Sequence, residues 1–160
     1  YYQIMFKNNY LIILIFILTA QCGYQVVNQK DLRQFYIKSI ELEGEKRLNR
    51  KISKNILFYS KESNNNVFNI KIKTDKTRSI IEKNIKNEIV KYQVDISSNV
   101  EFYDFETGVS FTNVFSERGN FTVGNKNIDT RNSEKKLIED LTEKISKKIV
   151  KKLRLDKNDS

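Results

Sequence analysis

Apolar side chains alternate with mostly polar ones over thirteen positions between Val90 and Phe102. Successive side chains of a β-strand point to opposite faces, so this pattern predicts a long strand with one buried face. A strand of this length can cross a whole sheet. Its apolar face must be covered by other elements, which limits the chain to folds in which a sheet packs on a second layer.

Shorter patterns predict the other elements of an α+β domain. We expect a two-layer sandwich, in which a small, mainly antiparallel four-stranded sheet carries two helices on one face. Gly108 ends the turn into the last strand, where it can adopt a positive φ. Before the long strand, the predicted elements are a strand Phe35–Glu43, a helix Glu45–Tyr59 and a strand Phe68–Thr74. After it come a turn Asp104–Gly108, a strand Val109–Glu117 and a helix from Ser133 that reaches Leu153.

The N-terminal residues have the pattern of a secretory signal. Leu11–Leu18 is an unbroken apolar run, preceded by Lys7 and two asparagines. Such a run is too short to span a membrane, which takes about 20 apolar residues, but it suits the hydrophobic region of a signal peptide. We therefore expect residues 1–21 to be a signal peptide, with Met5 as the true start.

Cys22 is the single cysteine of the chain and lies just after the apolar run. The sequence "LTAQC" resembles the lipobox of bacterial lipoproteins, in which the thiol carries diacylglycerol and the chain is cut before the cysteine. Lipidation would explain an exported protein with one cysteine and no disulfide partner. The alternative is a plain signal peptide with an unmodified thiol. Gly23 is not a retention signal of the aspartate kind, so sorting to the outer membrane is expected.

The mature chain reads as one domain with short flanks. We predict a lipid-anchored linker at residues 22–34, the folded domain at 35–155 and a polar tail at 156–160. Lysine and arginine number 29 against 20 acidic residues, an excess that usually points to a polyanionic partner. The chain is also rich in Lys, Asn and Ile and has no Pro, Trp or His, as coding from an A/T-rich genome would give, so the charge alone decides little. The absence of histidine removes the usual general base and metal ligand. We therefore predict no enzyme activity, no metal and no cofactor.

Several segments in order resemble one family. "CGYQ" at the cysteine, the strand "IVKYQVDISSNVEFYD", the segment "RGNFTVGNKNIDTRNSEKKLIEDL" and the final helix "TEKISKKIVKKL" are similar to the lipopolysaccharide-assembly lipoprotein family (LptE-like). The resemblance covers nearly the whole mature chain and implies an α+β domain. It also implies a plug in a one-to-one complex with the large outer-membrane β-barrel of the lipopolysaccharide translocon. Such a protein contacts lipopolysaccharide, faces the periplasm and is anchored in the inner leaflet of the outer membrane.

Binding lipid phosphates requires basic side chains that form charge-assisted hydrogen bonds. Arg78, Lys83 and Lys86 are expected in the turn region between the second and third strands, and Arg131 just before the final helix. The resemblance implies basic residues near these places. For each of them, an ordinary exposed basic side chain is the alternative. The lysines late in the final helix are interpreted as a solvated face that complements the helix dipole.

Two other functions agree with parts of the sequence. Basic residues interleaved with tyrosine and phenylalanine could bind RNA or DNA, but an apolar N-terminal run has no use in a cytosolic nucleic-acid binder, so no nucleic-acid partner is predicted. A structural envelope lipoprotein that handles no lipid is also compatible with the sequence. Only the resemblance to the plug family separates it from the preferred function.

Overall fold

The computed structural model describes residues 34–62 and 66–155. Every described residue belongs to one compact unit, residues 33–160. The predicted signal peptide, Cys22 and the polar tail lie outside the described residues. In chain order the elements are β1 (Tyr36–Gly44), α2 (Lys46–Tyr59), β2 (Val67–Lys83), β3 (Ile89–Asp104), β4 (Ser110–Thr122) and α3 (Asn127–Leu155).

The four strands form one sheet in the order β1-β2-β3-β4. β1 runs parallel to β2, whereas β2, β3 and β4 form an antiparallel meander. The parallel pair is possible because α2 connects the two strands, as a crossover connection must. The sheet is therefore mixed and mainly antiparallel, and the predicted fold class is confirmed.

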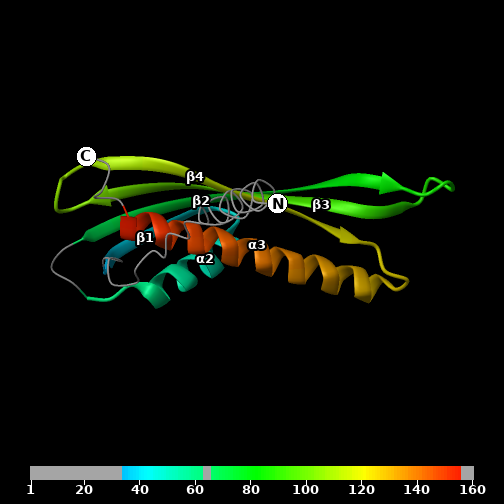
Figure 1. Cartoon of the computed structure of the whole chain (residues 1–160), viewed down its shortest axis with the longest axis horizontal. Helices are drawn as coiled ribbons and strands as arrows, with labels where there is room; N and C mark the ends of the chain where they lie inside the picture. Colours follow the sequence, from blue (N-terminus) through cyan, green and yellow to red (C-terminus); the bar gives the residue numbers. More distant parts are fainter. Residues whose placement is uncertain (1–33, 63–65, 156–160) are drawn as a thin grey trace, which may run out of the picture. The chain divides into compact units, whose positions relative to one another are not determined.

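Both helices cover the same face of the sheet (Figure 1). α2 contributes Leu48, Ile52 and Ile56 to the core at four-residue spacing, and α3 contributes residues at the same spacing from Leu141 to Leu153. These spacings place the apolar side chains of each helix on one stripe. Beneath them lie the buried side chains of the long central strand, which confirms its predicted register. That strand's core residues include Val94, Ile96, Val100 and Phe102, while Tyr92 is partly buried.

Buried hydroxyl groups in this core have hydrogen-bond partners. Thr74 on β2 and Ser98 on β3 are hydrogen-bonded at 2.8 Å across the sheet. In α3, the Ser146 hydroxyl donates to the Thr142 carbonyl oxygen at 2.8 Å. Asn55 of α2 donates to the same serine at 3.3 Å, which joins the two helices. Satisfied polar groups of this kind avoid the cost of burial without a partner.

Gly44 makes the sharp turn from β1 into α2 possible. Its φ of +80° lies in the left-handed region that favours glycine, and a Cβ atom there would come within 2.6 Å of the Thr74 carbonyl oxygen. The same oxygen accepts a hydrogen bond from the Glu45 amide at 2.9 Å. The start of α2 is thereby fixed against the middle of β2.

Several predicted boundaries are wrong, because the strands are longer than their apolar patterns. β2 continues to Lys83 rather than ending at Thr74, so Arg78 lies within a strand and not in a turn region. β2 reaches this length because it pairs with β3 in antiparallel register, from Phe68 opposite Asp104 to Lys83 opposite Ile89. β4 likewise continues past Glu117 to Thr122, and α3 begins at Asn127, so that Arg131 lies inside the helix.

The turn between β3 and β4 follows the predicted chemistry. The Asp104 carboxylate accepts hydrogen bonds from the Glu106 amide at 2.8 Å and from the Thr107 hydroxyl at 3.0 Å. Gly108 has a φ of +69°. Asp104 is therefore a turn-forming residue, as expected for aspartate in such a sequence.

Candidate functional site

A groove of about 310 Å³ lies between the start of α2, the middle of β2 and the first half of α3. Leu48 and Ile138 supply its apolar lining. Around them stand five basic residues, Arg47, Lys51, Lys76, Arg131 and Lys135, and three acidic ones, Glu45, Glu134 and Glu139. The groove thus combines an apolar surface with an excess of positive charge.

Two of the acidic residues are engaged in ion pairs. Lys51 donates to Glu139 at 2.7 Å, and this hydrogen bond holds the pKa of the Glu139 carboxyl below its usual value. Glu134 pairs at 3.2 Å with Arg78, which reaches it from β2. Within the described part of the chain, the side chains of Lys76 and Arg131 make no hydrogen bond or ion pair. These two cations are therefore open to an anion that enters the groove.

Arg78, one of the predicted ligands, packs against aromatic rings. Its guanidinium lies 3.7 Å from the centre of the Tyr92 ring and 5.3 Å from that of Phe121, on neighbouring strands. The same group is paired with Glu134 of α3. At this position of β2 the arginine side chain covers the aromatic rings, as an apolar side chain would, and the cation–π contact stabilises the arrangement. Arg78 therefore joins the sheet to α3.

Lys83 and Lys86 lie at the hairpin that connects β2 to β3. The Lys83 ammonium donates to the Asn87 side chain at 3.0 Å, and the Lys86 amide donates to the Asn84 side chain at 2.9 Å. Three isoleucines of the same hairpin, Ile80, Ile81 and Ile85, are exposed. This hairpin extends away from the end of the sheet where β1 begins (Figure 1).

The four predicted basic residues therefore do not form one cluster. Only Arg131 lines the groove; Arg78 borders it through Glu134, and the two lysines belong to the hairpin. The sequence analysis missed Arg47, Lys51, Lys76 and Lys135, which come from three different elements. Lys76 could have been found, since it occupies an apolar position of the β2 alternation, opposite Ile96.

The lysines late in α3 are exposed and partly neutralised, as predicted for a solvated face. Lys147 pairs with Glu143 at 2.7 Å, one helical turn away. This contact lowers the pKa of Glu143 and raises that of Lys147. Lys148 pairs with Glu117 of β4 at 2.5 Å. These contacts explain the charges without a ligand.

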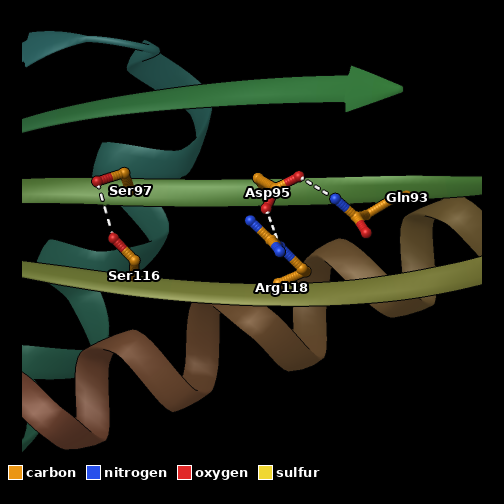
Figure 2. A network of polar contacts seen from close by, with 5 residues as sticks. All are labelled: Gln93, Asp95, Ser97, Ser116 and Arg118. Atoms are coloured by element: carbon orange, nitrogen blue, oxygen red, sulfur yellow. Dashed lines mark hydrogen bonds and ion pairs between the residues drawn. The ribbon is translucent and has the colours of Figure 1, made fainter. Parts of the chain in front are cut away.

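The other face of the sheet carries a network of polar side chains (Figure 2). Arg118 on β4 donates to Asp95 on β3, Gln93 donates to the same carboxylate at 2.8 Å, and Ser116 donates to Ser97 at 3.0 Å. The bond from Arg118, followed by that from Gln93, holds the pKa of Asp95 below its usual value. No helix among the described residues covers this face, which we call the open face.

The described residues contain neither a cluster suited to a metal ion nor a helix suited to cross a membrane. Among the described residues, no three acidic, histidine or cysteine side chains are grouped so as to hold a metal ion. None of the helices in the described ranges has a stretch that is both long enough and apolar enough to cross a membrane. The 29-residue α3 is charged along much of its length.

No family model matches the sequence, and no curated protein matches it either. The fold, however, is shared with solved structures of bacterial lipoproteins. Rare lipoprotein B from Shewanella oneidensis superposes with a TM-score of 0.56 at 9% identity, over 72% of this chain and 92% of that one. An uncharacterized lipoprotein B from Nitrosomonas europaea gives 0.59 at 7% identity, over 86% and 94% of the two chains. A minor lipoprotein from Acinetobacter baumannii gives 0.52 at 10% identity, over 76% and 93%.

Proposed function

We propose that this protein is a lipid-anchored lipoprotein of the outer membrane that binds lipopolysaccharide and plugs the barrel of the lipopolysaccharide translocon. The groove carries the proposal, because it places unpaired cations beside an apolar surface. Lipid A presents phosphate groups next to acyl chains, and such a ligand needs both features. Arg131 suits phosphate particularly well, since its planar guanidinium can make two parallel hydrogen bonds.

Two further observations support it. The N-terminal run and Cys22 have the pattern of an exported and lipidated chain. The shared fold belongs to bacterial lipoproteins, rare lipoprotein B among them. The protein acts by binding and positioning, without covalent chemistry, since the chain has no histidine and its one cysteine is the anchor.

The plugging role draws on the open face of the sheet. The lumen of a large outer-membrane barrel is polar, and the open face offers serine, glutamine and paired charges to such a wall. A core face packed by helices and a second face left hydrophilic would let one domain fold alone and still fit inside a water-lined pore. We expect one copy of the protein for each barrel.

Binding of purified lipopolysaccharide at physiological salt tests the groove. The test variant replaces the four cations that have no side-chain hydrogen bond, Arg47, Lys76, Arg131 and Lys135, with glutamine. These side chains are exposed, so each change should alter stability by no more than about 0.5 kcal/mol. Each charge-assisted contact that is lost should weaken binding by roughly tenfold or more.

Two matched variants complete the experiment. Glutamine at Lys144, Lys147 and Lys151 removes charge from the solvated face of α3 and should change binding little. Glutamine at Lys83 and Lys86 tests the hairpin predicted from the sequence, with Arg78 left in place because it supports α3. Unchanged lipopolysaccharide binding by the groove variant would contradict the proposed lipid site. An equal loss of binding in the α3 variant would show that binding depends on nonspecific charge attraction.

A further inference from the structure

Exposed apolar side chains gather at the end of the domain where the chain enters β1. They come from the end of α2, the turn between β3 and β4, and the last turn of α3, which Figure 1 shows at the same end of the sheet. Phe58 is the most exposed of them at 81%. We call this set the entry-end patch; it consists of Leu57, Phe58, Tyr59, Phe105, Val109 and Leu155.

Short contacts tie the segments of the patch together. The Lys61 amide donates to the Phe35 carbonyl oxygen at 3.0 Å, which places the end of α2 beside the start of β1. The Phe105 amide donates to Val67 at 3.0 Å, so the β3–β4 turn lies beside the start of β2. Since the starts of β1 and β2 are paired, these segments lie together at one end of the sheet.

Basic residues accompany these apolar side chains. The Lys38 ammonium lies 4.5 Å from the centre of the Phe105 ring, and the Arg154 guanidinium lies 5.5 Å from that of Tyr59. Lys54 precedes Phe58 by four residues on α2, so the two side chains share a helix face. Aromatic rings at an edge of positive charge suit the headgroup region of an anionic bilayer.

The length of the chain between Cys22 and β1 limits how far the entry-end patch can lie from a membrane that holds the anchor. Cys22 lies thirteen residues before Phe35, and a fully extended chain of that length reaches at most about 45 Å. A lipid on Cys22 would therefore keep the entry end of the domain close to the bilayer that holds the anchor. A diacylglycerol on Cys22 would hold the chain on the membrane through two acyl chains, but it would leave the orientation of the domain open. A patch of aromatic and basic side chains can supply the contact that fixes this orientation.

We propose that the entry-end patch lies against the anionic lipid surface to which the chain is tethered, with Phe58 at the headgroup level. This inference rests on the lipid-anchor part of the proposed function and adds a second membrane contact to it. The contact sets the orientation of the domain, because it turns the β2–β3 hairpin and the groove side away from the lipid. The patch is thus an interface with lipid rather than with a protein.

Tryptophan fluorescence can test the contact, because the chain has no native tryptophan. Phe58→Trp places an indole in the patch. Val114→Trp is the control, since Val114 is 66% exposed on the open face of the sheet, paired with Asn99. Mature protein, residues 22–160, is produced without the signal peptide so that its single thiol stays free. It is coupled through Cys22 to a maleimide lipid, in vesicles of phosphatidylethanolamine and phosphatidylglycerol that contain brominated acyl chains.

The indole of Phe58→Trp should shift its emission to shorter wavelength and be quenched by the brominated lipid, whereas that of Val114→Trp should remain as in water. The shift should be lost in vesicles of phosphatidylcholine alone. Equal quenching of both variants, quenching in neutral vesicles, or no quenching of Phe58→Trp would each overturn the inference. A shift that appears only after addition of outer-membrane extract, without lipid quenching, would assign the patch to a protein partner and overturn it as well.

The coupling chemistry keeps this test separate from that of the anchor. Because the coupled protein is produced without its signal peptide, tethering through a maleimide lipid replaces cellular acylation and does not require that cells acylate Cys22. A solvent-exposed indole in the tethered protein therefore counts against the membrane contact alone. Mass spectrometry that finds Gln21 still joined to Cys22 in the exported protein would count against the lipid anchor of the proposed function.

Discussion

Arg78 shows how a charged side chain can serve as part of the packing between two layers. Its position on β2 faces the helices, where the other strand residues of the same face are largely apolar. The planar guanidinium covers Tyr92 with its face and reaches Glu134 with its edge. Lysine has no planar group and could not provide both contacts.

Replacement of Arg78 should therefore lower stability more than other exposed basic residues would. Arg78→Gln loses an exposed cation–π contact and a partly exposed ion pair, which together are worth about 1 kcal/mol. Arg78→Lys keeps the charge and should recover part of this loss. Urea denaturation measures both, with Arg131→Gln as the matched control on the other side of the groove. A variant as stable as the unmodified protein would show that the stacking contributes nothing.

Val94 is the residue at which a charge should be least tolerated. It is fully buried in the middle of β3, between Arg78 on β2 and Gly119 on β4. Val94→Asp would bury a carboxylate whose neighbouring cation, Arg78, is already engaged by Tyr92 and Glu134. The change should cost about 3 kcal/mol or more, which is a large part of the stability of a small domain. Val114→Asp makes the same change on the open face and should be nearly neutral. Circular dichroism on heating distinguishes the two.

At the scale of the elements, the order of strands and helices could be predicted, whereas several ends could not. The alternation in β3 and the four-residue spacing in α3 are strong patterns, because each has one fully buried face. Beyond Thr74 the helix-facing positions of β2 carry Lys76 and Arg78, so the period-two pattern stops although the strand continues. Pairing with β3 fixes its length, and that information is not local.

The candidate groove was only partly predictable for the same reason. Arg131 was expected from the final helix entrance, but Arg47 and Lys76 join it only because α2 and β2 pack beside α3. Gly119 of β4 allows α3 to lie close to the sheet, since a Cβ atom there would lie 2.6 Å from the Leu137 side chain. A single sequence without an alignment does not contain such contacts between distant elements.

The pairing of β3 with β4 on the open face should respond to acid. The pKa of Asp95 lies below its ordinary value of 3.8, chiefly because Arg118 donates a hydrogen bond to the ionised carboxylate. A group whose pKa is lowered on folding stabilises the protein above its unfolded pKa, and this contribution disappears as the pH falls through the folded pKa. The stabilisation should thus be complete at neutral pH and decline below about pH 4.

The measurement compares urea midpoints of the unmodified protein and Asp95→Asn across this pH range. The difference between them should be present at neutral pH and shrink in acid, and it should also decrease in high salt because the pair is exposed. Asp75→Asn is the control, since Asp75 lies on the same face without an ion pair among the described residues. A difference in urea midpoint that stays constant with pH would show that ionisation of Asp95 does not contribute to stability.

In the domain as a whole, the proposed function gives the open face and the packed face separate roles. The packed face holds the core, while the open face has side chains fit for a polar wall. We therefore expect the protein from detergent-solubilised outer membrane to copurify with a large barrel in one-to-one stoichiometry. Val94→Asp should abolish copurification with the barrel because the domain unfolds. Val114→Asp should weaken copurification while the domain stays folded, as judged by size-exclusion chromatography. Recovery of the protein alone under mild detergent would argue against the plug.

The parallel pairing of β1 with β2 also determines the order in which the chain can fold. β2, β3 and β4 are joined by short turns and can pair as soon as they are synthesised, whereas β1 must wait until α2 and β2 have followed it. The apolar stripe of α3 comes last and completes the core. Until α3 follows, Leu48, Ile52 and Ile56 of α2 can pack only on the sheet and are incompletely covered. A chaperone that shields α2 during this interval should raise the yield of folded protein.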